Sequence, residues 1–368
     1  MRDPLLLTPG PATTDIAVKA AMLRDWGSWD DDFRAVTADI RRRLLAILGP
    51  AGRDFACVPM QGSGSFVVEA MLGTLVPADG KALVLMNGAY GQRIARTLRV
   101  MGRAPVVLDT GDYLPPTPEQ VDALLHEDAA ITHVVVVHCE TSSGILNPVE
   151  AIAEVVARHG RRLLVDAMSS FGALDLDPGR IRYDAVVASA NKCLEGVPGF
   201  GWALVRRDAL EQGAGNAHSL SLDLFDQWRH MEATGQWRFT PPTHVVVALA
   251  AALDAYEAEG GLTGRGARYE ANRAALVEAM AAIGIRPFLE ADVMSPIIVT
   301  FRCPKDPAFD FPTFYQAVKR RGFMLYPGKL TEAETFRVGC IGQVTPADMR
   351  AAVAAMADAC AEMGVHLP

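Results

Sequence analysis

The chain has 368 residues, of which 50% are hydrophobic and 21% charged, a composition typical of a soluble globular protein with a large core. Its formal net charge of −8 argues against a nucleic acid or an anionic membrane as a partner, because both bind to basic surfaces. No apolar run is long enough to span a membrane, and Met1–Pro4 does not begin a secretory signal, so we expect a cytoplasmic protein.

The N-terminal part begins with an extended Pro/Gly segment at Leu5–Pro11, and a short helix is predicted at Asp15–Leu23. Asp25–Phe33 combines aromatic and acidic residues without a helical period, which indicates an ordered loop. In Val36–Leu48, arginines alternate with Ile and Leu at helical spacing, and Gly49-Pro50 ends this predicted helix.

Glycines and hydroxyl groups precede the next predicted helix, Phe66–Leu75. Free backbone N–H groups and the helix dipole favour an anion at such a start, so Gly64 and Ser65 are predicted to bind a phosphate group. The alternative is a dinucleotide-binding G-x-G-x-x-G fingerprint, but its third glycine is missing. The following strand, Lys81–Met86, also ends in Asn87 rather than in an acid for the ribose, which excludes this alternative.

Three apolar runs in the middle of the chain predict buried strands. Thr132–His138 is the strongest of these predictions, and a helix from Asn147 to about His159 follows it. Arg162–Asp166 and Tyr183–Ser189 have the composition of fully buried parallel strands. The middle of the chain is therefore predicted to form a parallel sheet.

Two of these strands lead to residues that can do chemistry, Asp166 and Lys192. Ligands of open α/β sheets bind beyond the carboxyl ends of the strands, so the two side chains are expected to share one site. An amine can form a Schiff base with an aldehyde cofactor, and an aspartate can hold the proton on a pyridine nitrogen. The pair therefore predicts a pyridoxal 5′-phosphate (PLP) site, although a capping Asp and a solvated Lys would explain either residue alone.

Histidine and cysteine positions do not predict a metal site. His133 and His138 are five residues apart, so along a strand they point to opposite faces and cannot bind one ion. The six cysteines include no C-x-x-C pair, which favours reduced thiols over a disulfide framework. Cys139, Cys193 and Cys340 flank proposed site segments, where either a nucleophilic thiol or, more commonly, a small buried side chain fits.

Beyond Lys192, a glycine-rich bend at Glu195–Gly201 leads into a predicted strand, Trp202–Val205. The region Asp208–Arg238 is predicted to be irregular, and Thr243 opens a long helix.

Gly260-Gly261 separates that helix from a further one at Tyr269–Ile283 and is the best position for a domain boundary. We therefore predict an extended segment at 1–15, a large domain at 16–260 and a small α/β domain at 261–368. The small domain is predicted to contain these strands and helices: Ile297–Phe301, Phe311–Arg321, Phe323–Tyr326, Phe336–Cys340 and Met349–Met363.

Arg337 lies inside the predicted strand Phe336–Cys340, where a charged side chain is unusual. An Arg fork suits a bidentate carboxylate or phosphonate, and an acidic protein needs such local basic residues to bind an anionic substrate. The alternative is an edge-strand Arg that faces solvent.

The interval between Asp166 and Lys192 (192 − 166 = 26) resembles that of the fold-type I PLP enzymes. Within them the chain resembles class V and, more closely, the 2-aminoethylphosphonate:pyruvate transaminase family. The segments that carry this resemblance are Leu5–Pro11, Asp25–Asp30, Tyr326–Leu330 and Phe336–Gly342. The resemblance implies a large domain with a mostly parallel, doubly wound sheet, a small C-terminal α/β domain and a homodimer. It also implies that the strand after Lys192 returns antiparallel.

The resemblance also implies roles for single residues. Tyr90 is expected to stack on the pyridine ring and Thr141 to bind the phenolic oxygen of PLP. Gly64 and Ser65 are expected to bind its phosphate, with Ser65 standing where the family usually has Thr. Thr243 is expected to reach the cofactor phosphate of the partner subunit. The alternatives are a core tyrosine for Tyr90 and a plain helix N-cap for Thr243.

The reaction implied by the resemblance moves the amino group of 2-aminoethylphosphonate to pyruvate, giving phosphonoacetaldehyde and L-alanine. Lys192 is then the catalytic base, and Lys329 and Arg24 are further candidates for the phosphonate. Other possibilities are an alanine- or serine-glyoxylate aminotransferase, a PLP-binding regulator and a PLP lyase. Asp25–Phe33 either shapes the entrance of the site or is a surface loop anchored by Trp26 and Trp29.

Overall fold

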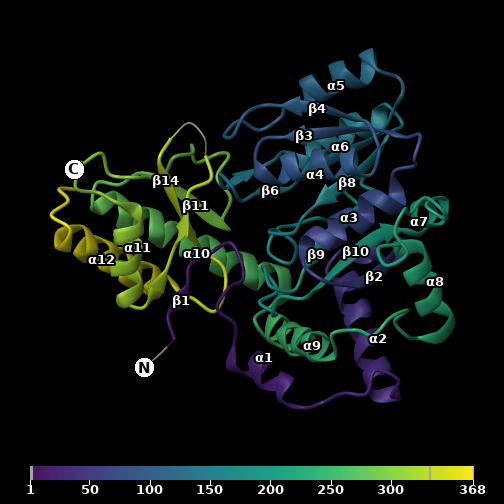
Figure 1. Cartoon of the computed structure of the whole chain (residues 1–368), viewed down its shortest axis with the longest axis horizontal. Helices are drawn as coiled ribbons and strands as arrows, with labels where there is room; N and C mark the ends of the chain where they lie inside the picture. Colours follow the sequence, from purple (N-terminus) through teal and green to yellow (C-terminus); the bar gives the residue numbers. More distant parts are fainter. Residues whose placement is uncertain (1–2, 331–332, 368) are drawn as a thin grey trace.

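The computed structural model describes residues 3–330 and 333–367, so Met1 and Arg2 of the predicted extended segment lie outside the described residues. Its central element is a seven-stranded sheet (Figure 1). All of its strands except β10 run in the same direction, which confirms the mostly parallel sheet and the antiparallel return after Lys192. The strand order is β2 (Phe55–Gln61), β10 (Phe200–Arg206), β9 (Ala185–Ser189), β8 (Arg162–Asp166), β5 (Ile131–Val137), β3 (Lys81–Met86) and β4 (Pro105–Asp109).

Helices cover both faces of this sheet because its strands are apolar on both sides. In β5, Val134 and Val136 pack into the core on one face, whereas Val135 and Val137 pack into the core on the other. One face is covered by α3 (Gly64–Leu75), α4 (Ala89–Val100), α7 (Arg207–Gln212) and α8 (Leu224–Thr234). The other face is covered by α2 (Asp31–Ala46), α5 (Pro118–Glu127), α6 (Val149–Arg158) and α9 (Thr243–Ala258).

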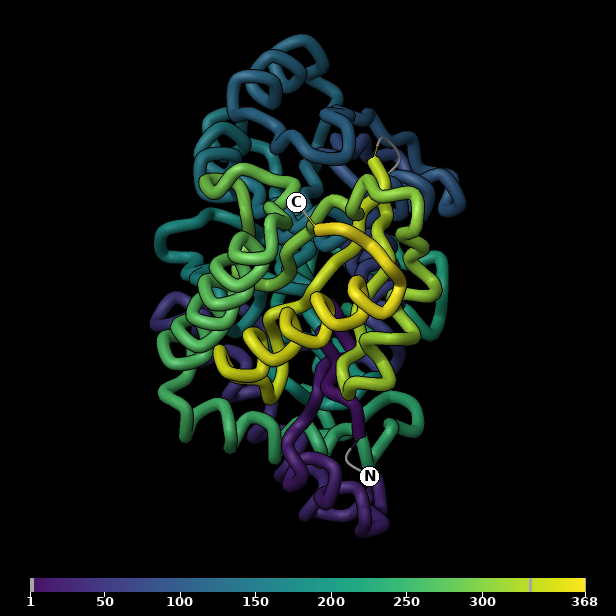
Figure 2. The backbone as a smooth tube through the Cα atoms, turned by 90° about the vertical axis from the view of Figure 1, so that its left-hand side faces the viewer, coloured from purple at the N-terminus to yellow at the C-terminus, as the bar shows by residue number. Residues whose placement is uncertain are grey.

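The C-terminal part forms a second lobe around a three-stranded sheet in the order β11-β14-β13 (Figure 1). The N-terminal segment runs alongside this lobe (Figure 2), because β1 pairs with β12 in parallel. The elements of the second lobe are α10 (Gly261–Ala282), β11 (Ile298–Arg302), α11 (Phe311–Arg320), β12 (Phe323–Met324), β13 (Tyr326–Pro327), β14 (Thr335–Gly339) and α12 (Pro346–Glu362). Short elements elsewhere are β1 (Leu5–Leu6), α1 (Ile16–Ala20), the 3-10 turns Ala21–Leu23 and Pro50–Asp54, β6 (Cys139–Glu140) and β7 (Ile145–Leu146).

The prediction that Asp208–Arg238 is irregular is wrong, because this region contains most of α7 and all of α8. Leu224 and Trp228 of α8 are buried against the sheet. The Asp223 carboxylate accepts from the N–H of Asp226 and caps the helix. Gly235 ends it in the left-handed conformation. The helix therefore has a regular start and stop that the short apolar pattern concealed.

Helices α2 and α10 begin more than one turn earlier than predicted. Helix α2 starts at Asp31 instead of Val36, and the acids of its first turn complement the helix dipole. Helix α10 starts at Gly261 instead of Tyr269 and runs from the large sheet towards the second lobe (Figure 1). Trp29 is 75% exposed and does not anchor the loop before α2. No helix in the described ranges has both the length and the apolar character needed to cross a membrane.

Candidate active site

The sheet places Asp166 and Lys192 at the same edge. Strand β8 ends at Asp166 and pairs in parallel with β9, after which the chain reaches Lys192. The carboxyl ends of the two strands therefore face one region, as the sequence predicted. Burial lowers the pKa of Lys192, although the Asp166 carboxylate acts to raise it. The two groups thus share one electrostatic environment, in which burial disfavours the charged form of the amine.

Asp166 is a buried carboxylate at the end of β8. Its side chain is 4% exposed, and Oδ1 accepts a hydrogen bond of 2.9 Å from the backbone N–H of Met168. No salt bridge to Asp166 occurs within the described residues. Burial raises the pKa of this carboxyl to about 6. A cationic N–H group in contact with Asp166 would remove this electrostatic cost.

The N-terminal segment covers Lys192. The Lys192 ammonium donates a hydrogen bond of 3.0 Å to the carbonyl oxygen of Pro9. A Cβ atom on Gly10 would lie 2.5 Å from Cδ of Lys192, and the φ of Gly10 is +121°, so the position requires glycine. The extended Pro/Gly segment is therefore part of the wall around the lysine.

Gly64 and Ser65 form the first turn of α3, where backbone N–H groups lack partners inside the helix. The Ser65 hydroxyl accepts a hydrogen bond of 3.0 Å from Nη1 of Arg93. Arg93 lines one cavity together with Gly64, Ser65, Tyr90 and Asp166. Sequence reasoning missed Arg93, although its position one helical turn after Tyr90 could have indicated it.

A buried carboxylate fixes Tyr90 at the start of α4. Glu140 is fully buried and accepts hydrogen bonds from the backbone N–H groups of Tyr90 at 3.0 Å and Gly91 at 3.4 Å. A negative charge at this end complements the helix dipole. Burial raises the pKa of Tyr90. Cations approach the tyrosine ring from two elements, with Arg93 Cζ at 5.1 Å and Lys329 Nζ at 5.6 Å from the ring centroid.

Arg337 reaches the same region from the second lobe. Strand β14 is the central strand of its sheet and Arg337 is fully buried, so the alternative of a solvent-facing edge residue is wrong. Its Nε donates to the carbonyl oxygen of Pro327 at 3.0 Å, and its Nη1 donates to that of Thr141 at 2.5 Å. Nη2 is buried without a hydrogen-bond partner among the described residues. The guanidinium thus keeps one donor group free for an anion.

Comparisons with known proteins show the family of this chain. The family model described as "Aminotransferase class-V" matches residues 72–311. A 2-aminoethylphosphonate–pyruvate transaminase of Rhizobium meliloti is 59% identical over 365 residues, which is 99% of this chain and 95% of the relative. The chain belongs to the class-V aminotransferase family.

Solved aminotransferase structures share the fold. The pyridoxamine-pyruvate aminotransferase of Mesorhizobium loti is 26% identical, with a TM-score of 0.90 over 100% of this chain and 94% of that one. The alanine–glyoxylate aminotransferase of Nostoc sp. is 22% identical, with a TM-score of 0.89 over 98% and 96% of the two chains. These matches confirm the predicted α/β architecture with its mostly parallel sheet.

Class-V aminotransferases are PLP-dependent enzymes, and the side chains of this site fit that cofactor. The carboxylate of Asp166, which has no ion-pair partner among the described residues, suits the protonated nitrogen of a pyridine ring, and Lys192 provides a half-buried amine. The start of α3 suits a phosphate group. Together these groups match the three chemical features of PLP.

Thr243 and Arg24 are not brought into this cluster. Thr243 opens α9 as predicted, and its hydroxyl lies 3.5 Å from Nδ1 of the adjacent His244. Arg24 packs on the ring of Trp26, with Cζ 4.1 Å from the centroid, and pairs with Asp32 at the surface. The ring of Tyr90 is approached instead by Arg93 and Lys329.

Proposed function

We propose that this protein moves the amino group of 2-aminoethylphosphonate to pyruvate, giving phosphonoacetaldehyde and L-alanine. The observation that carries the proposal is the free Nη2 donor group of the fully buried Arg337, in the electrostatic environment of Lys192. A guanidinium with a free donor suits a carboxylate or phosphonate. The high identity to the Rhizobium meliloti transaminase supports the choice of a phosphonate.

PLP is the proposed cofactor, and when bound it supplies an electron-withdrawing ring that stabilises negative charge on the reacting carbon. Asp166 accepts a hydrogen bond from the ring nitrogen and keeps that nitrogen protonated. Lys192 would hold the cofactor covalently, and its amine, when free, would move a proton at the substrate carbon. The other proposed binding residues are Gly64, Ser65, Tyr90, Thr141 and Thr243.

Arg337 serves both substrates in turn, because a ping-pong cycle uses one anion site for the phosphonate and then for the carboxylate of pyruvate. We propose a homodimer in which Thr243 reaches the cofactor phosphate of the partner subunit. We also propose a division into domains at 16–260 and 261–368, and a cytoplasmic location.

The reaction is tested by incubating the PLP-loaded protein with 2-aminoethylphosphonate and pyruvate, with phosphonate and alanine followed by NMR. We expect both products with pyruvate and little turnover with glyoxylate. A protein that ignored 2-aminoethylphosphonate but consumed alanine or serine with glyoxylate would be the alternative aminotransferase.

The lysine is tested by borohydride reduction of the PLP-loaded protein, followed by peptide mass spectrometry. We expect the cofactor on the peptide that contains Lys192, and no such label in Lys192→Ala. A label on another lysine contradicts the assignment of both cofactor attachment and proton transfer.

A further inference from the structure

The turn that carries Lys192 is closed by its own backbone. The N–H of Glu195 donates to the carbonyl oxygen of Lys192 at 2.9 Å, and the N–H of Gly196 donates to that of Ala190 at 2.7 Å. Glu195 has a φ of +59° and is the non-glycine residue in the described ranges that adopts a positive φ. Such a conformation is disfavoured for a side chain with a Cβ, so surrounding contacts must hold it.

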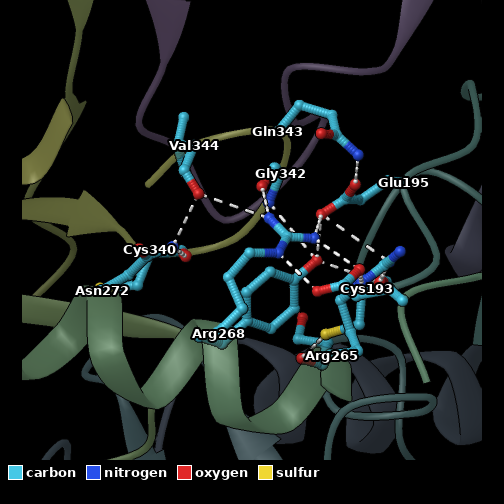
Figure 3. Close-up of polar contacts among 12 residues, drawn as sticks. Cys193, Glu195, Arg265, Arg268, Asn272, Cys340, Gly342, Gln343 and Val344 are labelled. Atoms are coloured by element: carbon cyan, nitrogen blue, oxygen red, sulfur yellow. Dashed lines mark hydrogen bonds and ion pairs between the residues drawn. The ribbon is translucent and has the colours of Figure 1, made fainter. Parts of the chain in front are cut away.

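Those contacts converge on the Glu195 carboxylate, which is 2% exposed (Figure 3). Its Oε1 accepts from Nη2 of Arg268 at 2.7 Å and from the Tyr269 hydroxyl at 2.6 Å. Its Oε2 accepts from Nε2 of Gln343 at 2.7 Å. The same Tyr269 hydroxyl also lies 3.0 Å from the carbonyl oxygen of Cys193. One carboxylate therefore joins the Lys192 turn to α10 and to a turn of the second lobe.

The second-lobe turn follows the strand that carries Arg337. Asn272 on α10 donates to the carbonyl oxygens of Cys340 at 2.9 Å and Val344 at 3.1 Å, and Arg268 donates to that of Gly342 (Figure 3). These bonds fix α10 to the end of β14. Hydrogen bonds thus connect the turn that follows Arg337 in the sequence to Glu195, which is three residues after Lys192.

We propose that Glu195 is a positioning residue that sets the placement of Lys192 relative to Arg337. The inference rests on the proposed function for the roles of those two side chains. Glu195 touches neither of them, and it acts by holding the Lys192 turn and the turn after β14 to the same carboxylate. A substrate anchored at Arg337 then meets the Lys192 amine in a fixed geometry.

The matched control is Glu259→Gln. Glu259 pairs with Arg265 at 2.7 Å and with Arg268 at 2.6 Å, so it shares the task of balancing their charge. Among the described residues its carboxylate contacts only these two arginines. Glu259→Gln therefore removes one charge from the same network without touching either turn.

Glu195→Gln keeps an acceptor for Arg268 and Tyr269 but replaces the charge-assisted hydrogen bond from Gln343 with one between two neutral amides, which weakens the link between the lobes. The double variant Glu195→Gln/Gln343→Glu exchanges the two groups, so the hydrogen bond returns with the opposite polarity and the net charge is unchanged. Recovery in the double variant identifies the link itself, and not merely a charge, as the cause.

The experiment compares the PLP-loaded variants by half-reaction kinetics and by hydrogen exchange of the backbone amides of the Lys192 turn. For Glu195→Gln we expect kcat to fall about ten- to a hundredfold with KM within about twofold, because binding groups remain while their spacing loosens. The Gly196 amide should exchange at least about tenfold faster. Glu259→Gln should keep kcat within about twofold, and the double variant should regain most of the loss.

A kcat loss in Glu195→Gln no larger than in Glu259→Gln overturns the proposal, and so does a double variant without recovery. If Glu195→Gln does not fold, Gln343→Ala removes the other partner of the same hydrogen bond. Gln343 is half-exposed, and its substitution must give the same kinetic pattern. Hydrogen exchange separates the positioning role of Glu195 from the proposed function, since it reports how stably the Lys192 turn is held even if the wild type does not accept 2-aminoethylphosphonate. Unchanged exchange in Glu195→Gln and Gln343→Ala overturns the positioning role alone.

Discussion

Asp166 makes the stability of the cofactor-free protein depend on pH. Burial raises the pKa of its carboxyl to about 6 in the folded chain, above the ordinary value of 3.8 that applies when unfolded. Because the folded protein binds the proton of this carboxyl more tightly than the unfolded chain does, protonation stabilises the fold. The stabilisation is complete below the unfolded pKa and is lost as the pH rises through the folded pKa. Above pH 6 the ionised carboxylate costs about 3 kcal/mol, at 1.36 kcal/mol per pKa unit.

Asp166→Asn should therefore stabilise the cofactor-free protein by up to about 3 kcal/mol at pH 8 and by well under about 1 kcal/mol at pH 4, as measured by urea unfolding. The exposed Asp79 gives the control, since Asp79→Asn should change neither value. With PLP bound, the same Asp166→Asn variant should lose most of its activity. An equal gain at both pH values contradicts the raised pKa.

Arg337 should matter in both half-reactions. Arg337→Lys keeps the positive charge but loses the planar fork that donates to Pro327 and Thr141 and presents Nη2 to the site. We expect at least a tenfold loss in kcat/KM for amination by alanine and for deamination of 2-aminoethylphosphonate, both followed by cofactor absorbance. Arg302→Lys, on the exposed side of β11, is the control. A loss confined to one half-reaction contradicts a shared anion site.

At the scale of elements, α4 depends on a carboxylate from outside the helix. Glu140 accepts from the first backbone N–H groups of α4 and thereby fixes Tyr90. Glu140→Gln removes the charge that complements the helix dipole, so we expect a loss of about 1–3 kcal/mol in the free energy of unfolding by urea. Glu119→Gln, exposed in the first turn of α5, should cost less than about 0.5 kcal/mol.

The strands of the central sheet were predictable because fully buried parallel strands are continuous apolar runs, and β3 and β8 begin and end where the sequence indicated. Helices α7 and α8 were missed because their buried positions are few and separated by polar residues. The early start of α10 was missed because Arg265 and Arg268 in its first turns bond to polar partners, not to an apolar core. Elements whose stability comes from tertiary polar contacts leave little signal in the sequence.

The site residues were likewise predictable only where a local sequence pattern indicated them. Asp166 and Lys192 were predictable because strand ends locate ligands in α/β sheets. Arg93 was not, since it repeats with Arg96 and Arg99 on α4 and resembles a solvated face. Glu195 was not, since its partner Tyr269 lies 74 residues away in the sequence. Roles that depend on such distant partners require the fold.

At the scale of the whole molecule, two large apolar side chains that are close in sequence to proposed site residues lie at the surface of the single chain. Phe66 follows Ser65 directly and is 53% exposed, and Phe239, shortly before Thr243, is 44% exposed. Exposed apolar groups of this size often mark a protein interface. Together with the placement of Thr243 outside the site cluster of its own chain, they support two-chain active sites.

Subunit complementation tests this arrangement. Lys192→Ala removes the attachment point, and Thr243→Glu places a negative charge where the partner's cofactor phosphate is expected, although the first turn of α9 accepts an acid. Each variant alone should be inactive. If Thr243 acts across a twofold interface, each hybrid dimer contains one intact site, so an equal mixture after subunit exchange should recover about a quarter of the wild-type activity. If Thr243 acted within its own chain, every site in the mixture would carry a defect and no activity would return. Size-exclusion chromatography of the wild type at assay concentration gives the independent check, because full activity in a monomer contradicts the shared site.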